Sequence, residues 1–223
     1  MQMPASTVLV TGTDTGVGKT WAACALARAL RSAGRSVVAV KAVETGCTDD
    51  PAATEDGVRL AAATGQAAPG RALRRFRAPL APALAADLEG GILDLDELAA
   101  EIESLGGNAD VLLLEGVGGL LNPLGWEWTV LDLAQAFQAT ALVVASDCLG
   151  AINHTLLTLS ALDLAGIRVA GIVLNAPAVS DVSTGANGAA IARLSGIERI
   201  RAVPRIAEPD AAVPWLVEVA GWL

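Results

Sequence analysis

Short runs of apolar residues alternate along this chain with longer stretches in which apolar positions recur at helical spacing. Two of these runs, VLLL at 111–114 and ALVVA at 141–145, contain no polar residue, which is typical of strands covered on both faces by helices. Repeated strand–helix units of this kind form a parallel sheet with right-handed crossovers. The sequence therefore predicts an α/β fold with helices on both faces of a mostly parallel sheet of about seven strands.

The apolar runs and the punctuation between them place the elements. Strands are expected at Ser6–Thr11, Val37–Val43, Asp110–Glu115, Ala141–Ser146, Arg168–Asn175 and Arg199–Val203. Helices are expected at Lys19–Ala33, Thr54–Ala63, Asp94–Leu105, Thr129–Phe137, Ile152–Ala165, Ala186–Leu194 and Ala211–Trp222. Residues 71–91 are expected to form a broken helix or loop, and residues 176–188 a mobile loop. No linker interrupts the pattern, so residues 1–223 are expected to form a single domain.

The charge balance and composition exclude several classes of protein. The chain has 24 acidic and 15 basic residues, a net charge of −9, which disfavours nucleic acid and anionic membranes as partners. No apolar run reaches the ~20 residues of a membrane span, and residues 1–7 lack the features of a signal peptide. Three scattered cysteines without a C-x-x-C pair suggest reduced thiols. We therefore expect a cytoplasmic protein that binds neither nucleic acid nor membrane.

The strongest motif is VLVTGTDTGVGKTW at residues 8–21, which predicts a strand, a glycine-rich loop and the start of a helix. Backbone N–H groups in such a loop, together with the positive end of the helix, form a cradle for phosphates. Lys19 would reach the terminal phosphates of a nucleotide, and the hydroxyl of Thr20 would bind Mg²⁺. Five residues separate Gly12 from Gly18 where the usual spacing has four. The segment thus predicts a variant phosphate-binding loop and a P-loop NTPase-like fold.

Lysine is rare in this chain, since thirteen of the fifteen basic residues are Arg and only Lys19 and Lys41 are Lys. Lys41 ends the second expected strand, in VVAVKAVETG. Ligands of open parallel sheets bind beyond the carboxyl ends of the strands, which places Lys41 at the same edge as the glycine loop. Thr45 follows in the adjoining loop. The alternative is a solubilising surface lysine, but the preference for Arg elsewhere favours a role for Lys41 at the site.

Glu115 ends the third expected strand, in LLLEGVGG, and is the candidate carboxylate for Mg²⁺ opposite the phosphate loop. An unpaired buried carboxylate is costly, so a Glu at this position usually has a cation or a hydrogen-bond network. Gly116, Gly118 and Gly119 would let the backbone approach the phosphates. Asp56 is a second candidate, with a solvated acid in the first turn of a helix as its alternative.

Together these segments resemble the dethiobiotin synthetase family over nearly the whole chain. Residues 12–20 match the family loop GTDTxVGKT with its five-residue spacing, residues 41–46 resemble its lysine-bearing strand end, and residues 115–119 resemble its EGAGG. Residues 149–154 resemble its LGxxNH segment, Asn175 falls where the family has an adenine-reading Asn, and residues from 203 onward resemble its later nucleotide loop.

The resemblance implies an ATP- and Mg²⁺-dependent cyclo-ligase that converts 7,8-diaminononanoate and CO2 to dethiobiotin through a carbamate and a carbamic–phosphoric anhydride. It implies catalytic roles for Lys19 and Lys41, and a homodimer whose neighbouring subunit holds the substrate carboxylate at a helix N-terminus. The implied nucleotide contacts are Gly16, Val17, Gly18, Lys19, Thr20, Trp21, Asp56, Glu115, Gly116, Val117, Gly118, Asn175, Ala176, Pro204, Arg205 and Ile206, with Thr20, Asp56 and Glu115 also at Mg²⁺. The implied substrate contacts are Thr15, Thr45, Gly150, Ala151, Ile152 and Asn153.

The sequence departs from the family at several positions. Gly16 stands where some members have an acidic residue, and Ala81 and Ala83 replace its usual Ser and His on the substrate side. Trp126 and Trp128 would line either the hydrocarbon chain of the substrate or an interface.

Two other classes use comparable folds. An ATPase switch of the ParA/MinD kind usually has an additional lysine near the first glycine of the loop, which is absent here. An amide-forming corrinoid enzyme normally carries a glutaminase domain, for which 223 residues leave no room.

Overall fold

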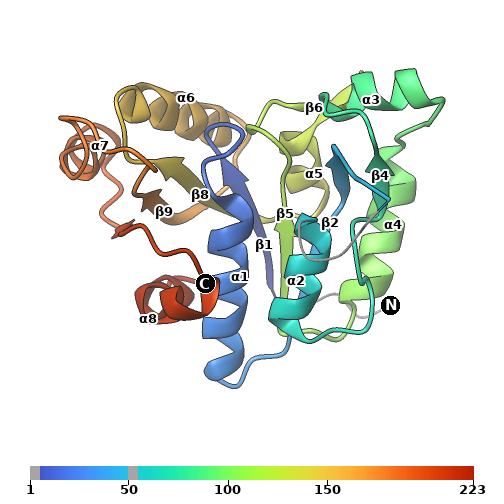
Figure 1. Ribbon diagram of the computed structural model, residues 1–223, viewed down its shortest axis with the longest axis horizontal. Coiled ribbons are helices and arrows are strands. Elements are labelled where there is room, and N and C mark those ends of the chain that lie inside the picture. The colour runs from blue at the N-terminus through green and yellow to red at the C-terminus, as the bar shows by residue number, and fades with distance from the viewer. Residues whose placement is uncertain (1–5, 50–54) are drawn as a thin grey trace.

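Six parallel strands form the central sheet, in the order β10-β9-β8-β1-β5-β2 (Figure 1). The computed structural model describes residues 6–49 and 55–223. The strands are β1 (Ser6–Gly12), β2 (Val37–Lys41), β5 (Val111–Glu115), β8 (Thr140–Ser146), β9 (Val169–Asn175) and β10 (Ile200–Val203). The α/β class and parallel sheet are confirmed, with six strands in the sheet where about seven were expected.

Four short strands of the described residues lie outside the central sheet. β3 (Val43–Thr45) pairs in parallel with β4 (Arg74–Phe76), and β6 (Pro123–Gly125) pairs with β7 (Trp128–Thr129) in an antiparallel hairpin. The strand expected to run without a break from Val37 to Val43 is divided after Lys41. The division occurs because the N–H groups of Leu73 and Arg74 bind the carbonyls of Lys41 and Ala42, which draws the chain out of the sheet.

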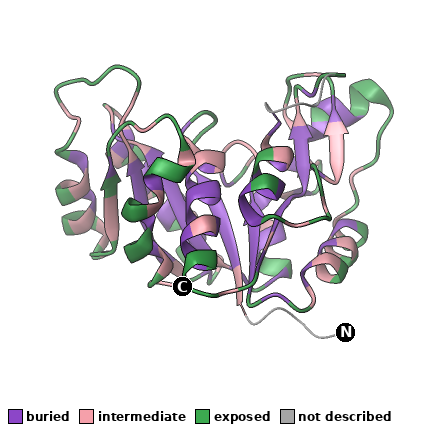
Figure 2. Cartoon of the chain, turned by 60° about the horizontal axis from the view of Figure 1, so that its bottom comes forward, coloured by how far each residue is buried: buried purple, intermediate pink, exposed green. Residues whose placement is uncertain are grey.

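Helices cover both faces of the sheet, as its apolar strands require. On one face α1 (Lys19–Ser32) packs between α2 (Asp56–Thr64) and α8 (Pro209–Ala220) (Figure 1). The other face is covered by α4 (Leu95–Gly106), α5 (Val130–Ala136), α6 (Ala151–Leu164) and α7 (Asn187–Ser195). Most residues of the strands between these layers are buried, except in β10 at the border of the sheet, where only Val203 is (Figure 2). None of the helices in the described part of the chain has the length and apolar character needed to cross a membrane.

The start of α4 agrees with the sequence, whereas the segment at 71–91 differs from what the sequence indicated. Asp94 caps α4 by accepting the N–H of Glu97 at 2.8 Å, as the spacing predicts. The expectation of a broken helix or loop at 71–91 was only partly right, because β4 and α3 (Pro82–Glu89) lie there. Pro82 occupies the first turn of α3, where its missing N–H removes no hydrogen bond. The expected helix start at Thr54 lies outside the described residues.

The exposed edge of β2 is closed by one side chain. The Gln66 amide accepts the N–H of Ala39 at 2.8 Å and donates to the carbonyl of Ala39 at 2.9 Å, so it pairs with that residue as another strand would. The same amide also donates to the carbonyl of Pro69 at 2.8 Å. Edge strands of a sheet are commonly protected from further pairing by such covers.

Candidate active site

The glycine loop joins the end of β1 to the start of α1, as the motif predicts. Gly18 lies in the left-handed region (φ +94°), and a Cβ on it would come within 2.4 Å of Asn175 Nδ2. Lys19 Nζ donates to the carbonyl of Asp14 at 2.9 Å, and Asn175 Nδ2 donates to the carbonyl of Val17 at 2.8 Å. These two bonds hold the loop at Asp14 and at Val17, directly before the N-terminal turn of α1.

Lys41 lies at the centre of a buried polar cluster next to this loop. Its ammonium donates to Glu115 Oε1 at 2.6 Å, to Asp56 Oδ2 at 2.9 Å and to the carbonyl of Gly116 at 3.2 Å. The hydroxyl of Thr20 donates to the same Glu115 oxygen at 2.7 Å. Four segments that are distant in the sequence therefore meet at one point: the start of α1, the ends of β2 and β5, and the start of α2.

The electrostatics of the two lysines differ. Burial alone would lower the pKa of Lys41, but the carboxylates of Glu115 and Asp56 outweigh burial and raise it. Burial, reinforced by the nearby charge of Lys41, lowers the pKa of Lys19 to about 8. Lys41 thus keeps its proton at neutral pH, while the charge of Lys19 depends on what binds beside it.

The two acids of the cluster also differ. Burial raises the pKa of Glu115, against the opposing effects of Lys41 and Thr20. Burial would raise the pKa of the Asp56 carboxyl, but Lys41, with smaller contributions from Thr20 and Arg59, outweighs burial and holds this pKa below its usual range.

The donor set fits a divalent cation. Glu115 Oε2 is buried and has no hydrogen-bond partner among the described residues, which leaves one carboxylate oxygen available at the cluster. Asp56 and the hydroxyl of Thr20 adjoin it, and carboxylate and hydroxyl oxygens are the ligands that Mg²⁺ prefers. The three residues assigned to Mg²⁺ on sequence grounds are therefore together and chemically suitable.

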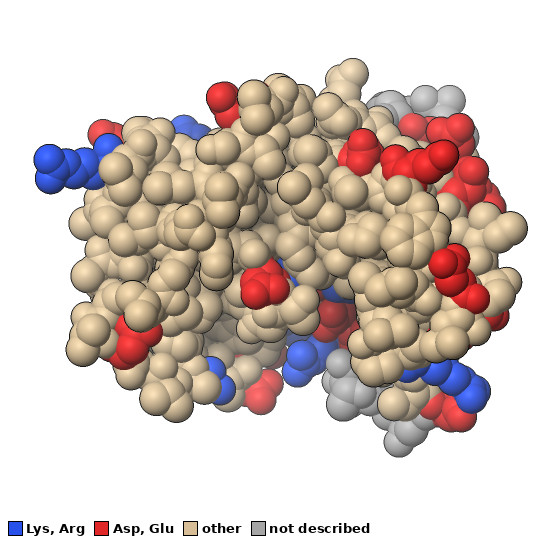
Figure 3. All heavy atoms as spheres, turned by 90° about the horizontal axis from the view of Figure 1, so that it is seen from above, with Lys and Arg blue, Asp and Glu red and all other residues tan. Residues whose placement is uncertain are grey.

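A cavity of about 320 Å³ joins the loop to this cluster. Eleven of the expected site residues line it: Thr15, Gly16, Gly18, Lys19, Thr20, Trp21, Lys41, Thr45, Asp56, Val117 and Gly118. The cavity lies at the carboxyl ends of the strands, the end that faces the viewer in Figure 3, where most of the surface is uncharged. Both lysines of the chain thus face one cavity.

Comparison with known proteins agrees with this geometry. A family model described as an AAA domain matches residues 6–212. The ATP-dependent dethiobiotin synthetase BioD of Anaeromyxobacter dehalogenans strain 2CP-1 is 43% identical over 96% of this chain and 92% of its own length. The BioD of Aquifex aeolicus is 40% identical over 91% of this chain and 90% of its own. The chain belongs to the dethiobiotin synthetase family. It is accordingly an enzyme of this ligase family.

Solved structures extend the likeness of the fold beyond the dethiobiotin synthetases. MinD of the Aquifex aeolicus MinC:MinD complex aligns with a TM-score of 0.61 at 17% identity, covering 97% of this chain and 94% of that one. The cell division ATPase MinD of Pyrococcus furiosus aligns with a TM-score of 0.58 at 18% identity, over 98% of each chain. At this identity the likeness shows the fold alone. The fold is thus common to ATPases and dethiobiotin synthetases, and sequence similarity assigns the chain to the latter.

The other expected nucleotide contacts also lie at the carboxyl ends of the strands. Asn175 ends β9 beside the loop, and its Oδ1 is buried without a partner in the described structure. Ala176 donates its N–H to the carbonyl of Val203 at 3.0 Å, so the ends of β9 and β10 run side by side. Pro204, Arg205 and Ile206 follow directly after β10. The contacts of these residues with a nucleotide stay predictions.

The substrate contacts implied by the resemblance to dethiobiotin synthetases fall into two groups. Thr15 and Thr45 line the cavity. Gly150, Ala151, Ile152 and Asn153 form the N-terminal turn of α6 and do not line it. If the turn binds the carboxylate tail of a substrate held in the neighbouring subunit, it has to lie outside the cavity of its own chain. That role stays a prediction.

Two residues of the cavity wall were not anticipated, Glu44 and Arg59. Glu44 lies three positions after Lys41 in the strand end that was singled out, and Arg59 lies three positions after Asp56 on one face of α2. Helical spacing from Asp56 was a usable signal for Arg59. For Glu44 the sequence offered only its position near Lys41.

The two tryptophans that follow the glycine turn have different environments. Trp128 is buried in the core, and its indole donates to the carbonyl of Leu93 at 3.1 Å. Trp126 is 65% exposed and donates to Asp87 Oδ2 of α3 at 2.9 Å. Neither lines the cavity at the glycine loop. Trp128 is therefore a core residue, whereas Trp126 lies on the surface.

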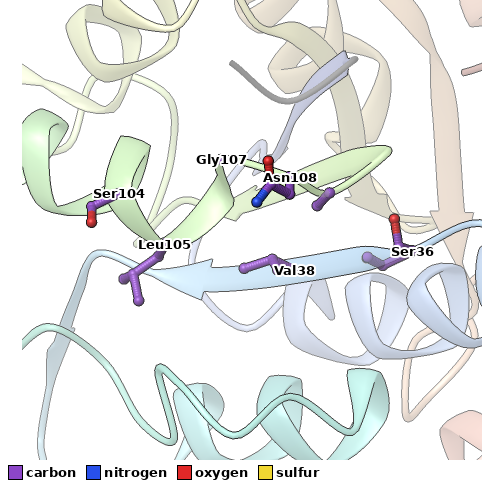
Figure 4. Close-up of a pocket in the computed structure, with 8 residues that line it drawn as sticks. Ser36, Val38, Ser104, Leu105, Gly107 and Asn108 are labelled. Atoms are coloured by element: carbon purple, nitrogen blue, oxygen red, sulfur yellow. The ribbon is translucent and has the colours of Figure 1, made fainter. Parts of the chain in front are cut away.

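One other cavity and one other polar cluster among the described residues are weaker candidates for a binding site. A cavity of about 300 Å³ lies at the opposite end of β2, between Ser36, Val38 and the end of α4, and has no charged side chain (Figure 4). Glu44, Cys47 and Glu55 are close enough together to bind a metal. Their carboxylates are already engaged, that of Glu55 by Arg75 and that of Glu44 by backbone N–H groups.

Proposed function

We propose that this chain catalyses the ATP-dependent carboxylation and ring closure of 7,8-diaminononanoate with CO2 to give dethiobiotin, ADP and phosphate. One amine takes up CO2 to form a carbamate, and the carbamate oxygen attacks the γ-phosphorus of ATP and displaces ADP. The second amine then attacks the carbonyl carbon of the anhydride, phosphate leaves, and the urea ring closes. The observation that carries the proposal is that Lys19 and Lys41 line one cavity within a dethiobiotin synthetase sequence.

The reaction brings together three anionic groups: the carbamate, the transferred phosphoryl group and the departing ADP. Lys41, held protonated by Glu115 and Asp56, supplies a fixed positive charge at the cavity wall. Lys19 supplies the second charge from the loop, and phosphate binding would favour its protonated form. Charges positioned in advance in this way stabilise a transition state without reorganisation.

Mg²⁺ would be held by Thr20, Asp56 and Glu115, and when bound it would supply positive charge to the phosphate oxygens of ATP. Thr45 lines the cavity, and its hydroxyl would donate to the carbamate. Asn175 uses its Nδ2 on the loop and leaves Oδ1 free, so it can accept a hydrogen bond from the adenine amino group.

We further propose that the enzyme is a homodimer. The N-terminal turn of α6 has no side-chain cap, so N–H groups of this turn would suit a carboxylate, but the turn does not line the cavity of its own chain. Leu149 and Leu157, beside and on α6, are exposed at 80% and 62%. A second copy placed against this helix would bring the turn to the substrate tail and cover these apolar residues.

The direct test is ADP release by the purified protein in the presence of Mg²⁺-ATP, bicarbonate and 7,8-diaminononanoate. We expect release that depends on the diamine, with dethiobiotin as product by mass spectrometry. ATP hydrolysis at the same rate without the diamine would instead support an ATPase of the MinD kind and contradict the proposal. Light scattering in solution would test the dimer separately, since a monomer at assay concentration with full activity would contradict it.

A further inference from the structure

The carboxylate of Glu44 is bound to the start of a helix that carries a proposed Mg²⁺ ligand. Glu44 Oε1 accepts the N–H of Asp56 at 2.5 Å, and its Oε2 accepts the N–H of Gly57 at 3.1 Å. Glu44 is only 8% exposed. Both of its oxygens are therefore used within the protein, although the residue lies at the wall of the cavity.

The start of α2 has no cap of the ordinary local kind. The first N–H groups of a helix lack partners within it and are usually bound by the side chain just before the helix. Here that residue is Glu55, which makes no cap and instead binds Arg75 of β4 through both oxygens. The cap is supplied by Glu44, twelve residues earlier on β3.

This remote cap connects two parts of the proposed site. The β2–β3 segment carries Lys41, Glu44 and Thr45, and α2 carries Asp56, whose Oδ2 lies 2.9 Å from Lys41 Nζ. Glu44 holds the backbone of Asp56 while Lys41 holds its side chain. The position of Asp56 beside Glu115 and Thr20 is thus fixed from the strand that also carries the lysine.

We propose that Glu44 is a positioning residue that sets Asp56 for Mg²⁺ binding. The inference rests on the proposed Mg²⁺ site and not on the ligase reaction. Residues that orient a metal ligand commonly change metal affinity by about 10- to 100-fold when they are replaced. In this role Glu44 acts through the backbone of Asp56 and Gly57, whose N–H groups bind its two oxygens.

The test is the factor by which Mg²⁺ tightens ADP binding, measured by calorimetry with Mg²⁺ and with EDTA. Glu44→Gln keeps the size of the side chain but turns an NH2 group toward one of the two helix N–H groups. We expect this variant to reduce the Mg²⁺ factor by about tenfold and to leave metal-free ADP binding within about twofold of wild type. An unchanged Mg²⁺ factor would overturn the proposal.

A matched control and a double variant separate positioning from simple loss of stability. Asp94→Ala removes the equivalent cap at the start of α4, far from the site, and should lower Tm without changing the Mg²⁺ factor. In an Asp56→Asn background, Glu44→Gln should cause no further loss of Mg²⁺ dependence, because the two residues act through one contact. Equal losses from Glu44→Gln in both backgrounds would overturn the proposal.

The wild-type protein gives a test that needs no variant. The amides of Asp56 and Gly57 should exchange with D2O about tenfold or more slowly than that of Asp210, in the first turn of α8, whose cap makes no side-chain bond. Fast exchange at both amides would overturn the proposal even if Glu44→Gln fails to fold. ADP binding does not involve the diamine, so failure of the ligase assay would leave this result standing.

Discussion

Lys41 and Glu115 are directly opposite each other in the register of neighbouring strands β2 and β5, and Lys41 Nζ lies 2.6 Å from Glu115 Oε1. Both side chains are almost fully buried, at 3% and 1% exposure. A buried ion pair contributes little net stability, because desolvation offsets the attraction. What this pair provides is an ammonium group fixed at the carboxyl end of the sheet, where the segments carrying the sequence motifs meet.

The proposed role of Lys41 predicts that charge alone is insufficient at this position. Lys41→Arg should fold but lose most diamine-dependent turnover, because a planar guanidinium cannot reproduce the three contacts of the ammonium with Glu115, Asp56 and Gly116. Turnover and Tm would be measured together, with the exposed Arg193→Lys on α7 as the control. Wild-type rates in Lys41→Arg would contradict the proposed site.

The pKa of Lys19 predicts how nucleotide binding depends on pH. Because burial lowers this pKa to about 8, the free protein loses the Lys19 proton as the pH rises above 8. Phosphate binds the protonated form, so metal-free ADP affinity should fall above pH 8 by up to about tenfold per pH unit. Calorimetry from pH 7 to 9.5 measures this. Lys19→Arg, which stays charged, should give a flatter profile, and a flat wild-type profile would show that the prediction is wrong.

Asn175 is predicted to link loop geometry to recognition of the base. Asn175→Ala removes the bond to the Val17 carbonyl and the free Oδ1 together. Losing a hydrogen bond of this kind costs about 1–3 kcal/mol, so ADP affinity should fall by about 5- to 150-fold. The preference for ADP over GDP should fall as well, which competition binding would measure. An unchanged preference would remove Asn175 from base recognition.

Gly57 is predicted to tolerate no side chain. A Cβ there would come within 2.2 Å of the Ala72 backbone nitrogen and 2.6 Å of the Arg71 carbonyl carbon, so the start of α2 would have to move. Gly57→Ala should lower the free energy of unfolding by about 1–3 kcal/mol and reduce turnover. Gly70→Ala, whose Cβ meets only one atom, at 3.9 Å, is the matched control for urea unfolding. Equal stability of the two variants would contradict the prediction.

Much of the site could be predicted because its signals are local. The glycine spacing, Lys41 at a strand end and Glu115 at another all depend on a parallel sheet bringing its carboxyl ends to one edge. The apolar runs at 111–114 and 141–145 were enough to predict that sheet. The cap of α4 is local as well, since Asp94 accepts the N–H of a residue only three positions later.

The remainder depends on contacts between distant segments. Nothing near Glu44 in the sequence indicates that it caps a helix twelve residues later, since Glu55 would be the local candidate. Residues 71–91 were expected to form a broken helix or loop, yet Pro82 begins α3 there, because a proline is tolerated in the first turn of a helix. Trp128 was expected to line the substrate's hydrocarbon chain or an interface, but the hairpin β6–β7 places it in the core.

The amide of Gln66, paired with Ala39 at the border of β2, has a consequence for how copies of the protein can associate. Sheets with open borders recruit strands from neighbouring molecules and grow into aggregates. Next to Ala39 along this border, the N–H of Leu73 takes the carbonyl of Lys41, so two successive pairing positions are already filled. Polymerisation through β2 is thereby blocked. Two subunits that share a substrate would have to meet through helices and loops on this side, and each could keep its own sheet unchanged.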